Sequence, residues 1–377
     1  MKIEQRVYDA AAGWDTLAGK LGDEPAHLVL LFGDRHLLET GTGLDGLRRM
    51  YPGARVLAAS TSGEIMGTEV SEGRLVATAI AFSKTRIVCA TTMVTRVDQS
   101  YDAGRDLAQK LSASPDLVHV FVVSDGQLVN GTDLSRGFNE HLPKGVLLSG
   151  GLAGDGTRFE RTVVGLDEQP VPGRVVAVGL CGPALRVGFG SAGGWEAFGP
   201  ARVVTRAEHN TLYELDGQSA LQLYKKYLGD QAAQLPGSAL RFPLCLSPSG
   251  SDHTVVRTIL SIDEKAQAMT FAGDIPMGAG VRFMRASYED LIDGAAQAAE
   301  QTRSDAAAEL VICVSCVGRR IVLGQRTEEE TEIVRDTLGP DAVLTGFYSY
   351  GELAPADNAT ACQLHNQTMT ITSLRED

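Results

Sequence analysis

A strand–helix–strand unit that ends in a polar, glycine-containing corner occurs three times in this chain, and this repetition constrains the fold more than any other feature. Strand, helix and strand fall at 28–32, 43–50 and 55–59, at 118–123, 132–141 and 146–148, and at 310–314, 327–338 and 343–345. In the third copy, Thr327 and Glu330 have the spacing of a capping box, and Gly339 follows as a stop. Apolar strands joined by a helix are typical of βαβ units, so the sequence predicts an α/β fold.

The first half of the chain also carries an internal match at one fixed offset. Residues 73–77 read Gly-Arg-Leu-Val-Ala, residues 173–177 read Gly-Arg-Val-Val-Ala, and Arg86 and Arg186 occupy corresponding positions. Any two valine-rich strand pairs look alike, but identities at a common offset favour duplication. We therefore expect two lobes with mixed sheets flanked by helices, the N-terminal lobe internally duplicated. The Gly- and Pro-rich stretch 193–200 divides the chain into domains 1–197 and 198–377.

The length and net charge of the chain limit the classes of protein to which it can belong. A chain of 377 residues exceeds one average core, which agrees with two lobes. The formal net charge of −13 argues against a nucleic-acid binder and against binding to an anionic membrane surface. Residues 1–9 lack the apolar core of a secretion signal, and six scattered cysteines lie mostly in apolar runs. We expect a cytoplasmic protein with buried, reduced thiols.

Familiar catalytic and cofactor motifs are missing or out of context. Residues 188–193 match GxGxxG, but the Gly-Trp and Gly-Pro pairs that follow leave no room for the helix that a pyrophosphate needs. Cys313 and Cys316 form a CxxC inside an apolar strand, without a second pair to complete a zinc site. We interpret them as strand-core cysteines. The sequence contains no GxSxG, HExxH or Walker pattern.

The three polar corners are the strongest functional signal. They lie at 61–64, 150–155 and 348–352, each after a strand of its unit, and ligands of open α/β sheets bind at the carboxyl ends of strands. Every α/β protein has turn residues at such ends, which explains the glycines better than the acid in each corner. We therefore expect the three corners to converge around one shared ligand pocket. The residues predicted to contact a ligand are Thr61, Ser62, Glu64, Gly151, Gly154, Asp155, Tyr348, Tyr350 and Glu352.

Among seven histidines, His365 stands out. It lies in a predicted closing strand at 364–372, where alternation places it on one face with Met369 and Ile371. Because both of these residues are apolar, this face is expected to point inward. A core histidine with satisfied hydrogen bonds and a ligand-binding histidine both fit this pattern.

Several segments resemble a known family. Residues 150–156 resemble the glycine motif of FIST N-terminal domains, and residues 271–276, 291–295, 315–319 and 346–352 resemble FIST C-terminal domains. Met277 departs from the Pro-Glu-Gly expected there. The resemblance implies an intracellular sensory protein that binds a small ligand. Residues 362–370 further resemble NosP-type members, which bind haem, sense nitric oxide and regulate a histidine kinase or a cyclic-di-GMP enzyme.

If the ligand is haem, it needs an apolar slot, an axial ligand and cations for its propionates. His365 is the first axial candidate, with His209 and His253 as reserves. Arg319 and Arg320 could bind the carboxylates, although a solvated loop is the alternative for this pair. We expect a non-enzymatic sensor, with a base-rate expectation of a homodimer. An enzyme acting at the Ser/Gly/Glu corners and a scaffold without a ligand are the alternatives.

Overall fold

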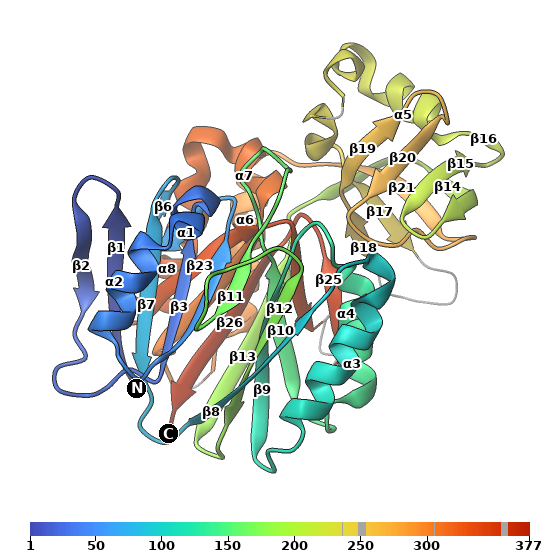
Figure 1. Ribbon diagram of the computed structural model, residues 1–377. Coiled ribbons are helices and arrows are strands. Elements are labelled where there is room, and N and C mark those ends of the chain that lie inside the picture. Colours follow the sequence, from blue (N-terminus) through green and yellow to red (C-terminus); the bar gives the residue numbers. More distant parts are fainter. Residues whose placement is uncertain (236, 248–253, 305, 356–360) are drawn as a thin grey trace.

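The protein consists of one insert and three modules of similar plan, in which β2 of module 1 takes the place of helices α3 and α6 in the other two (Figure 1). The computed structural model describes residues 1–235, 237–247, 254–304, 306–355 and 361–377. Module 1 contains β1 (Lys2–Asp9), β2 (Gly13–Gly19), β3 (Leu28–Gly33), α1 (Arg35–Thr40), α2 (Thr42–Met50), β4 (Arg55–Ser60), β5 (Glu64–Met66), β6 (Glu69–Ser71) and β7 (Leu75–Ala81). Module 2 contains β8 (Arg86–Met93), a 3₁₀ turn (Val97–Gln99), α3 (Ser100–Leu111), β9 (Leu117–Ser124), α4 (Gly131–His141), β10 (Leu147–Leu152), β11 (Val164–Leu166) and β12 (Arg174–Cys181).

Module 3 is interrupted by the insert after its first strand. It contains β13 (Leu185–Ala192), α6 (Tyr288–Gln301), β22 (Leu310–Cys316), α7 (Val317–Leu323), a 3₁₀ turn (Gly324–Arg326), α8 (Thr327–Leu338), β23 (Val343–Ser349), β24 (Gly351–Pro355), β25 (Cys362–His365) and β26 (Met369–Glu376). The insert contains β14 (Glu196–Glu208), β15 (Thr211–Leu215), β16 (Gln218–Ser219), α5 (Ala220–Leu228), 3₁₀ turns (Gly229–Gln234 and Gly237–Arg241), β17 (Leu244–Ser247), β18 (Val255–Arg257), β19 (Ile259–Asp263), β20 (Ala268–Phe271) and β21 (Gly280–Arg285).

The modules build three six-stranded sheets of one plan. The first sheet has the order β11-β4-β3-β7-β1-β2, the second β25-β24-β10-β9-β12-β8, and the third β13-β26-β22-β23-β5-β6. Each is built around one parallel pair, β3–β4, β9–β10 or β22–β23, and its helices make the crossover between the two strands. The strand that closes each module, β7, β12 or β26, then pairs antiparallel to the first strand of that pair.

The modules exchange strands in a cycle. After its parallel pair, module 1 sends β5 and β6 to the third sheet, module 2 sends β11 to the first, and module 3 sends β24 and β25 to the second. Every sheet is therefore completed by another module. Strands from both sides of the predicted division at residue 197 pair in the second and third sheets.

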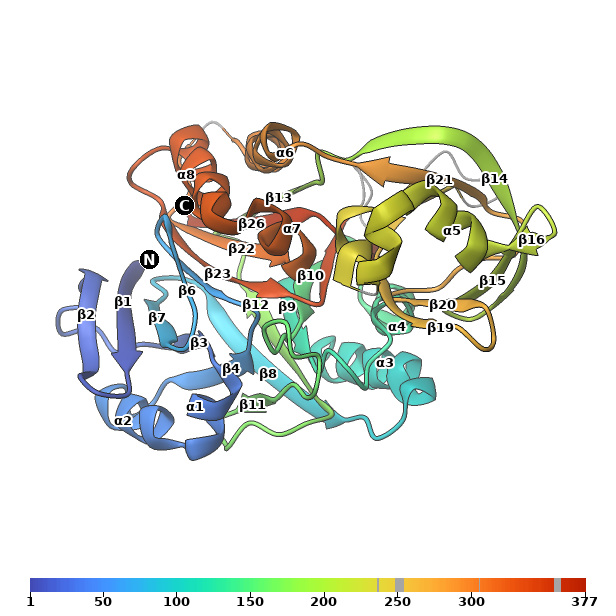
Figure 2. The ribbon, with the colours of Figure 1, turned by 90° about the horizontal axis from the view of Figure 1, so that it is seen from above.

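The three sheets pack their inner faces around one shared core, and their outer faces carry helices (Figure 2). In β3, Leu28, Leu30 and Phe32 point to the shared core, while Val29 and Leu31 pack with the helical layer of α1 and α2. Burial on both faces explains why these strands read as continuous apolar runs. Helices α3 and α4 cover the second sheet, and α6 and α8 cover the third. The insert has its own core.

The structure confirms the mixed α/β class, and the repeat extends to the third module. Cys313 and Cys316 are buried free thiols in β22, and burial raises the pKa of both, as expected for strand-core cysteines. Residues 188–193 lie in and just after edge strand β13, with no helix following. None of the helices in the described ranges combines the length and apolar character needed to cross a bilayer.

Two local predictions are wrong. The expected single strand at 364–372 is two strands, because Gln367 has a φ of 63° and turns the chain from β25 in the second sheet to β26 in the third. The capping box of Thr327 and Glu330 does not form: the Thr327 hydroxyl donates to Gly324 O, and Glu330 is buried. The buried side chain of Glu330 has another role, described below.

Candidate functional site

The three predicted corners meet one another. We call residues 61–64 corner 1, residues 150–155 corner 2, residues 348–352 corner 3, and their meeting point the corner junction. Main-chain hydrogen bonds link the three corners within or directly beside their ends. They run from Ser62 N–H to Tyr348 O (2.8 Å), from Tyr350 N–H to Leu152 O (3.1 Å), and from Gly154 N–H to the carbonyl of Ser60, the residue directly before corner 1 (2.9 Å). The convergence follows from the strand exchange, because each corner carries the chain from one sheet to the next.

The glycines of corner 2 serve this close contact. A Cβ atom on Gly154 would lie 2.3 Å from Ser62 Oγ and 2.7 Å from Ser62 N. A Cβ atom on Gly151 would lie 2.7 Å from Val314 Cγ1. The contact with the Ser62 main chain is too short for a side chain, so corner-to-corner packing requires glycine at position 154, whereas Gly151 packs against Val314 of β22. Approach of a ligand to these two glycines stays a prediction.

Corners 1 and 3 hold their acids in the same way. Thr61 Oγ1 donates to Glu64 Oε1 (2.7 Å), and Ser349 Oγ donates to Glu352 Oε1 (2.6 Å), three residues apart in each case. Glu352 Oε2 also accepts from the main-chain N–H (3.2 Å) and hydroxyl (3.0 Å) of Thr368. Burial raises the pKa of both carboxyl groups to about 8, against the hydrogen bonds that lower it. Near neutral pH the two acids are therefore mostly protonated.

The acid of corner 2 is in a different electrostatic environment. Asp155 Oδ1 accepts from Arg35 Nε (3.0 Å) and Arg158 Nε (2.9 Å). Burial alone would raise its pKa, but the hydrogen bonds from Arg158 and Arg35 hold it below the ordinary value. Asp155 is therefore ionised and serves as a buried anchor for two arginines.

The side chains of Arg319, Tyr348 and Tyr350 also make contacts inside the protein. Arg319 Nε donates to Glu330 Oε2 (2.7 Å), and both side chains are fully buried. Glu330 Oε1 accepts from the Tyr348 hydroxyl (2.8 Å). The Tyr350 ring stacks on Phe159 at 4.6 Å between centroids. The sequence predicted that these groups face a ligand. It did not identify Glu330 as their buried partner, because the spacing of Glu330 from Thr327 resembles that of a capping box.

Arg320 lies closer to solvent than Arg319. Its Nη1 donates to Ser62 O (2.5 Å), and its guanidinium lies 5.7 Å from the centre of the Tyr348 ring. It also pairs with the exposed Glu72. Arg320 thus covers corner 1 and belongs to helix α7, so the solvated loop considered as its alternative is wrong.

His365, the first axial candidate, lies at a strand end in contact with main chain. His365 lies at the end of β25, half buried and opposite Glu352 in the strand register, and its Nε2 lies 3.1 Å from Ala354 O. His365 lines none of the five cavities described for the protein. His209 is exposed at the turn between β14 and β15, and His253 lies outside the described residues. The described part of the chain holds no group of three or more His, Cys, Asp or Glu suited to a metal ion.

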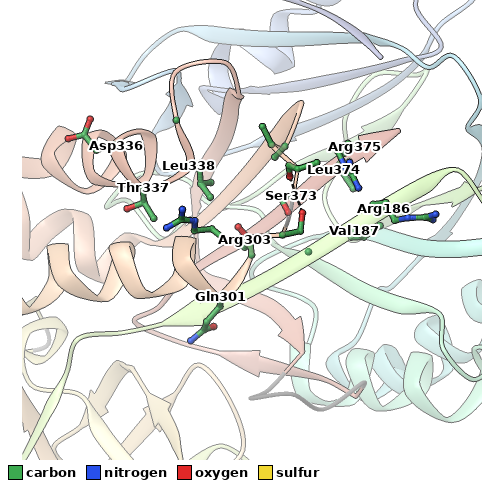
Figure 3. A pocket seen from close by; sticks show the side chains of 17 residues that line it. Arg186, Val187, Gln301, Arg303, Asp336, Thr337, Leu338, Ser373, Leu374 and Arg375 are labelled. Atoms are coloured by element: carbon green, nitrogen blue, oxygen red, sulfur yellow. Dashed lines mark hydrogen bonds between the residues drawn. The ribbon is translucent and has the colours of Figure 1, made fainter. Parts of the chain in front are cut away.

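Room for a ligand exists elsewhere, in a cavity of about 580 Å³ that we call the α6–α8 cavity (Figure 3). It lies between the ends of helices α6 and α8, the segment that follows α6, and the strand pair β13–β26. No corner residue lines it. Its polar wall residues include Arg186, Arg303, Asp336, Thr337, Ser373 and Arg375. Among these, the sequence singled out only Arg186, and only as a marker of the repeat.

Arg186 and Arg375 are directly opposite each other on β13 and β26. Asp377 lies between them: Arg186 Nη2 is 2.7 Å from Asp377 Oδ2, and Arg375 Nη2 is 2.9 Å from Asp377 Oδ1. Arg375 Nε is buried without a hydrogen-bond partner among the described residues. Arg303 instead pairs with Glu300 of its own helix end.

Comparison with protein families covers most of the chain. The FIST N domain matches residues 27–218, and the FIST C domain matches residues 220–355. No curated protein matches the chain. The two matches meet inside the insert, at β16 and directly before α5.

Proposed function

Because this chain belongs to the family of FIST-domain proteins, we propose that it is a sensory protein that binds a small ligand in the α6–α8 cavity and reports its occupancy to a partner. FIST domains are sensory domains of signalling proteins that bind small ligands, so the family supplies the class of function. The cavity carries the assignment of the site. Its volume of about 580 Å³ falls in the range of roughly 300–1,000 Å³ that is usual for small-molecule sites.

The proposed role is non-enzymatic. The Ser62 hydroxyl donates to Gly156 O and the Ser349 hydroxyl donates to Glu352, which are packing contacts rather than the activation of a nucleophile by a base. The protonated acids of the corner junction are buried away from the cavity. An enzyme acting at these corners would need substrate access that the close corner-to-corner contacts oppose.

The partner is proposed from the resemblance to NosP-type proteins alone, as a histidine kinase or a cyclic-di-GMP enzyme. The same resemblance suggests haem and nitric oxide; because His365 lines none of the described cavities, we propose a ligand of another kind for the α6–α8 cavity. A partner would have to distinguish the filled from the empty protein. The α6–α8 cavity suits this requirement, because two helix ends and two strands form its walls.

The test is ligand binding to a variant with a filled cavity. Thr337 lies in the last turn of α8 on the cavity wall, and Thr337→Trp would fill the cavity. Glu332→Trp, on an exposed position of the same helix, is the matched control. Native mass spectrometry of the purified protein identifies a copurified ligand, and a thermal-shift screen finds others. We expect the ligand to be lost from Thr337→Trp and retained by Glu332→Trp. Equal binding to both variants would place the ligand elsewhere.

A further inference from the structure

The α6–α8 cavity has a charged wall that is built like an anion site. Arg186 and Arg375 face each other across neighbouring antiparallel strands, where like charges destabilise a sheet unless an anion lies between them. The carboxylate of Asp377 fills this role, with one oxygen on each arginine. We call this arrangement the arginine clamp. Its spacing suits the two oxygens of a carboxylate or of a phosphate.

The clamp is accessible, and its occupant is held loosely. The side chain of Asp377 is 38 % exposed and that of Arg186 is 52 % exposed, so solvent reaches the ion pairs and weakens them. Neighbouring Glu376 is fixed separately, since its carboxylate accepts the main-chain N–H groups of Ser83 (2.7 Å) and Lys84 (2.8 Å). Asp377 can therefore leave the clamp without release of the strand that carries it.

Arg375 offers a further donor to an incoming anion. Its Nε is buried and unpaired among the described residues, although a buried N–H of this kind normally has a partner. Figure 3 shows Arg186 and Arg375 together at one end of the cavity, with Arg303 and Ser373 nearer its middle. The other wall is formed by the C-terminal ends of α6 and α8, where helix carbonyls favour hydrogen-bond donors over anions.

Building on the proposed function, we propose that the ligand of the α6–α8 cavity is a small oxyanion-bearing molecule, whose carboxylate or phosphate displaces Asp377 from Arg186 and Arg375. The remainder of the molecule lies toward the helix ends and presents hydrogen-bond donors to them. Asp377 thus acts as an internal competitor, which sets the ligand concentration at which the cavity fills.

Succinate and inorganic phosphate are the probes, with uncharged succinamide as the matched control, in calorimetric titrations at constant ionic strength. Charge-assisted hydrogen bonds of about 1.5–3 kcal/mol correspond to a loss of roughly 10- to 150-fold in affinity for Arg375→Gln. Arg186→Gln, at an exposed position, should lose affinity in the same way without risk to folding. Asp377→Asn should bind both anions more tightly than the native protein, and succinamide should not distinguish the variants.

The outcomes separate this inference from the proposed function. If a molecule binds in the cavity, as judged by its loss in Thr337→Trp, but binds Arg375→Gln and Arg186→Gln with native affinity, the oxyanion assignment is wrong and the sensor proposal stands. If neither probe binds Asp377→Asn at millimolar concentration, the clamp is only a structural ion pair. Arg96→Gln is the control for a general loss of positive charge, because this exposed arginine of module 2 lies outside the cavity.

Discussion

Replacing Glu352 by Gln should remove most of one steep pH dependence of stability. Glu352 is fully buried, and burial raises its pKa from 4.5 to about 8. Between about pH 4.5 and about pH 8, the folded protein therefore keeps the carboxyl proton of Glu352, which the unfolded chain has released. Because the folded state binds more protons, stability falls as pH rises from about 4.5 to about 8. Gln remains neutral and can still hydrogen-bond to Ser349 and Thr368.

The size of the effect follows from the two pKa values. A difference of about 3.5 between folded and unfolded state, at about 1.4 kcal/mol for each pKa unit, gives on the order of 5 kcal/mol for complete titration. This loss of stability is absent below about pH 4.5 and complete above about pH 8. It is comparable to the entire stability of many domains, about 5–15 kcal/mol. Glu64 in corner 1, whose pKa burial also raises to about 8, should show a similar dependence.

Denaturant unfolding of the native protein and of Glu352→Gln at half-unit steps from pH 5 to pH 9 measures this dependence. The free energies of unfolding should be similar at pH 5 and should differ by several kcal/mol in favour of Glu352→Gln at pH 9. Glu332→Gln, exposed on α8, is the control and should follow the native curve. Parallel curves for native protein and Glu352→Gln over the whole range would refute the assignment of a buried, neutral acid.

Three other changes probe the corner junction and His365. Gly154→Ala should lower the free energy of unfolding by about 1–3 kcal/mol or more, because its Cβ would lie 2.3 Å from Ser62 Oγ. Gly53→Ala is the control and should be neutral, because its Cβ would meet nothing within 4 Å. Equal effects of the two substitutions in denaturant unfolding would contradict the packing. Glu330→Gln should lower the free energy of unfolding by about 3–5 kcal/mol because Arg319 stays buried without its charged partner. Glu329→Gln, at a half-exposed position paired with Arg326, should lower it by less than about 1 kcal/mol. Haem mixed with the protein should give the same absorption spectrum with His365→Ala as without it, and a Soret band that disappears in this variant would restore the haem hypothesis.

Much of the fold could be predicted because the spacing of apolar residues and the positions of turn residues agree with the observed helices and strands. The buried strands β3, β9 and β22 are covered on both faces, so they appear as apolar runs bounded by turn residues. The match of residues 73–77 with 173–177 corresponds to β7 and β12, which occupy the same place in their sheets. The cyclic exchange of β5, β11 and β24 could not be predicted, because the sequence of a short strand does not indicate which sheet it joins.

The candidate site was predicted less completely. The sequence identified the corner residues and their convergence, because strand ends of one unit type gather at one end of a fold. It could not show that the corners touch, since Gly154 is consistent both with a nearby ligand and with a nearby Ser62. Arg375 of the arginine clamp gave no signal, because its pairing with Arg186 depends on the register of β13 and β26, which are far apart along the chain.

The cyclic strand exchange makes the three modules one cooperative unit. Separating the chain at residue 219, between the two matched domains, would leave the first fragment without β24 for the second sheet and the other fragment without β5 for the third. Each half would then expose a sheet edge that the other half covers in the intact protein. The two domains matched along the sequence therefore complete each other's sheets, so a perturbation in any module can reach the remaining two through strands they hold in common.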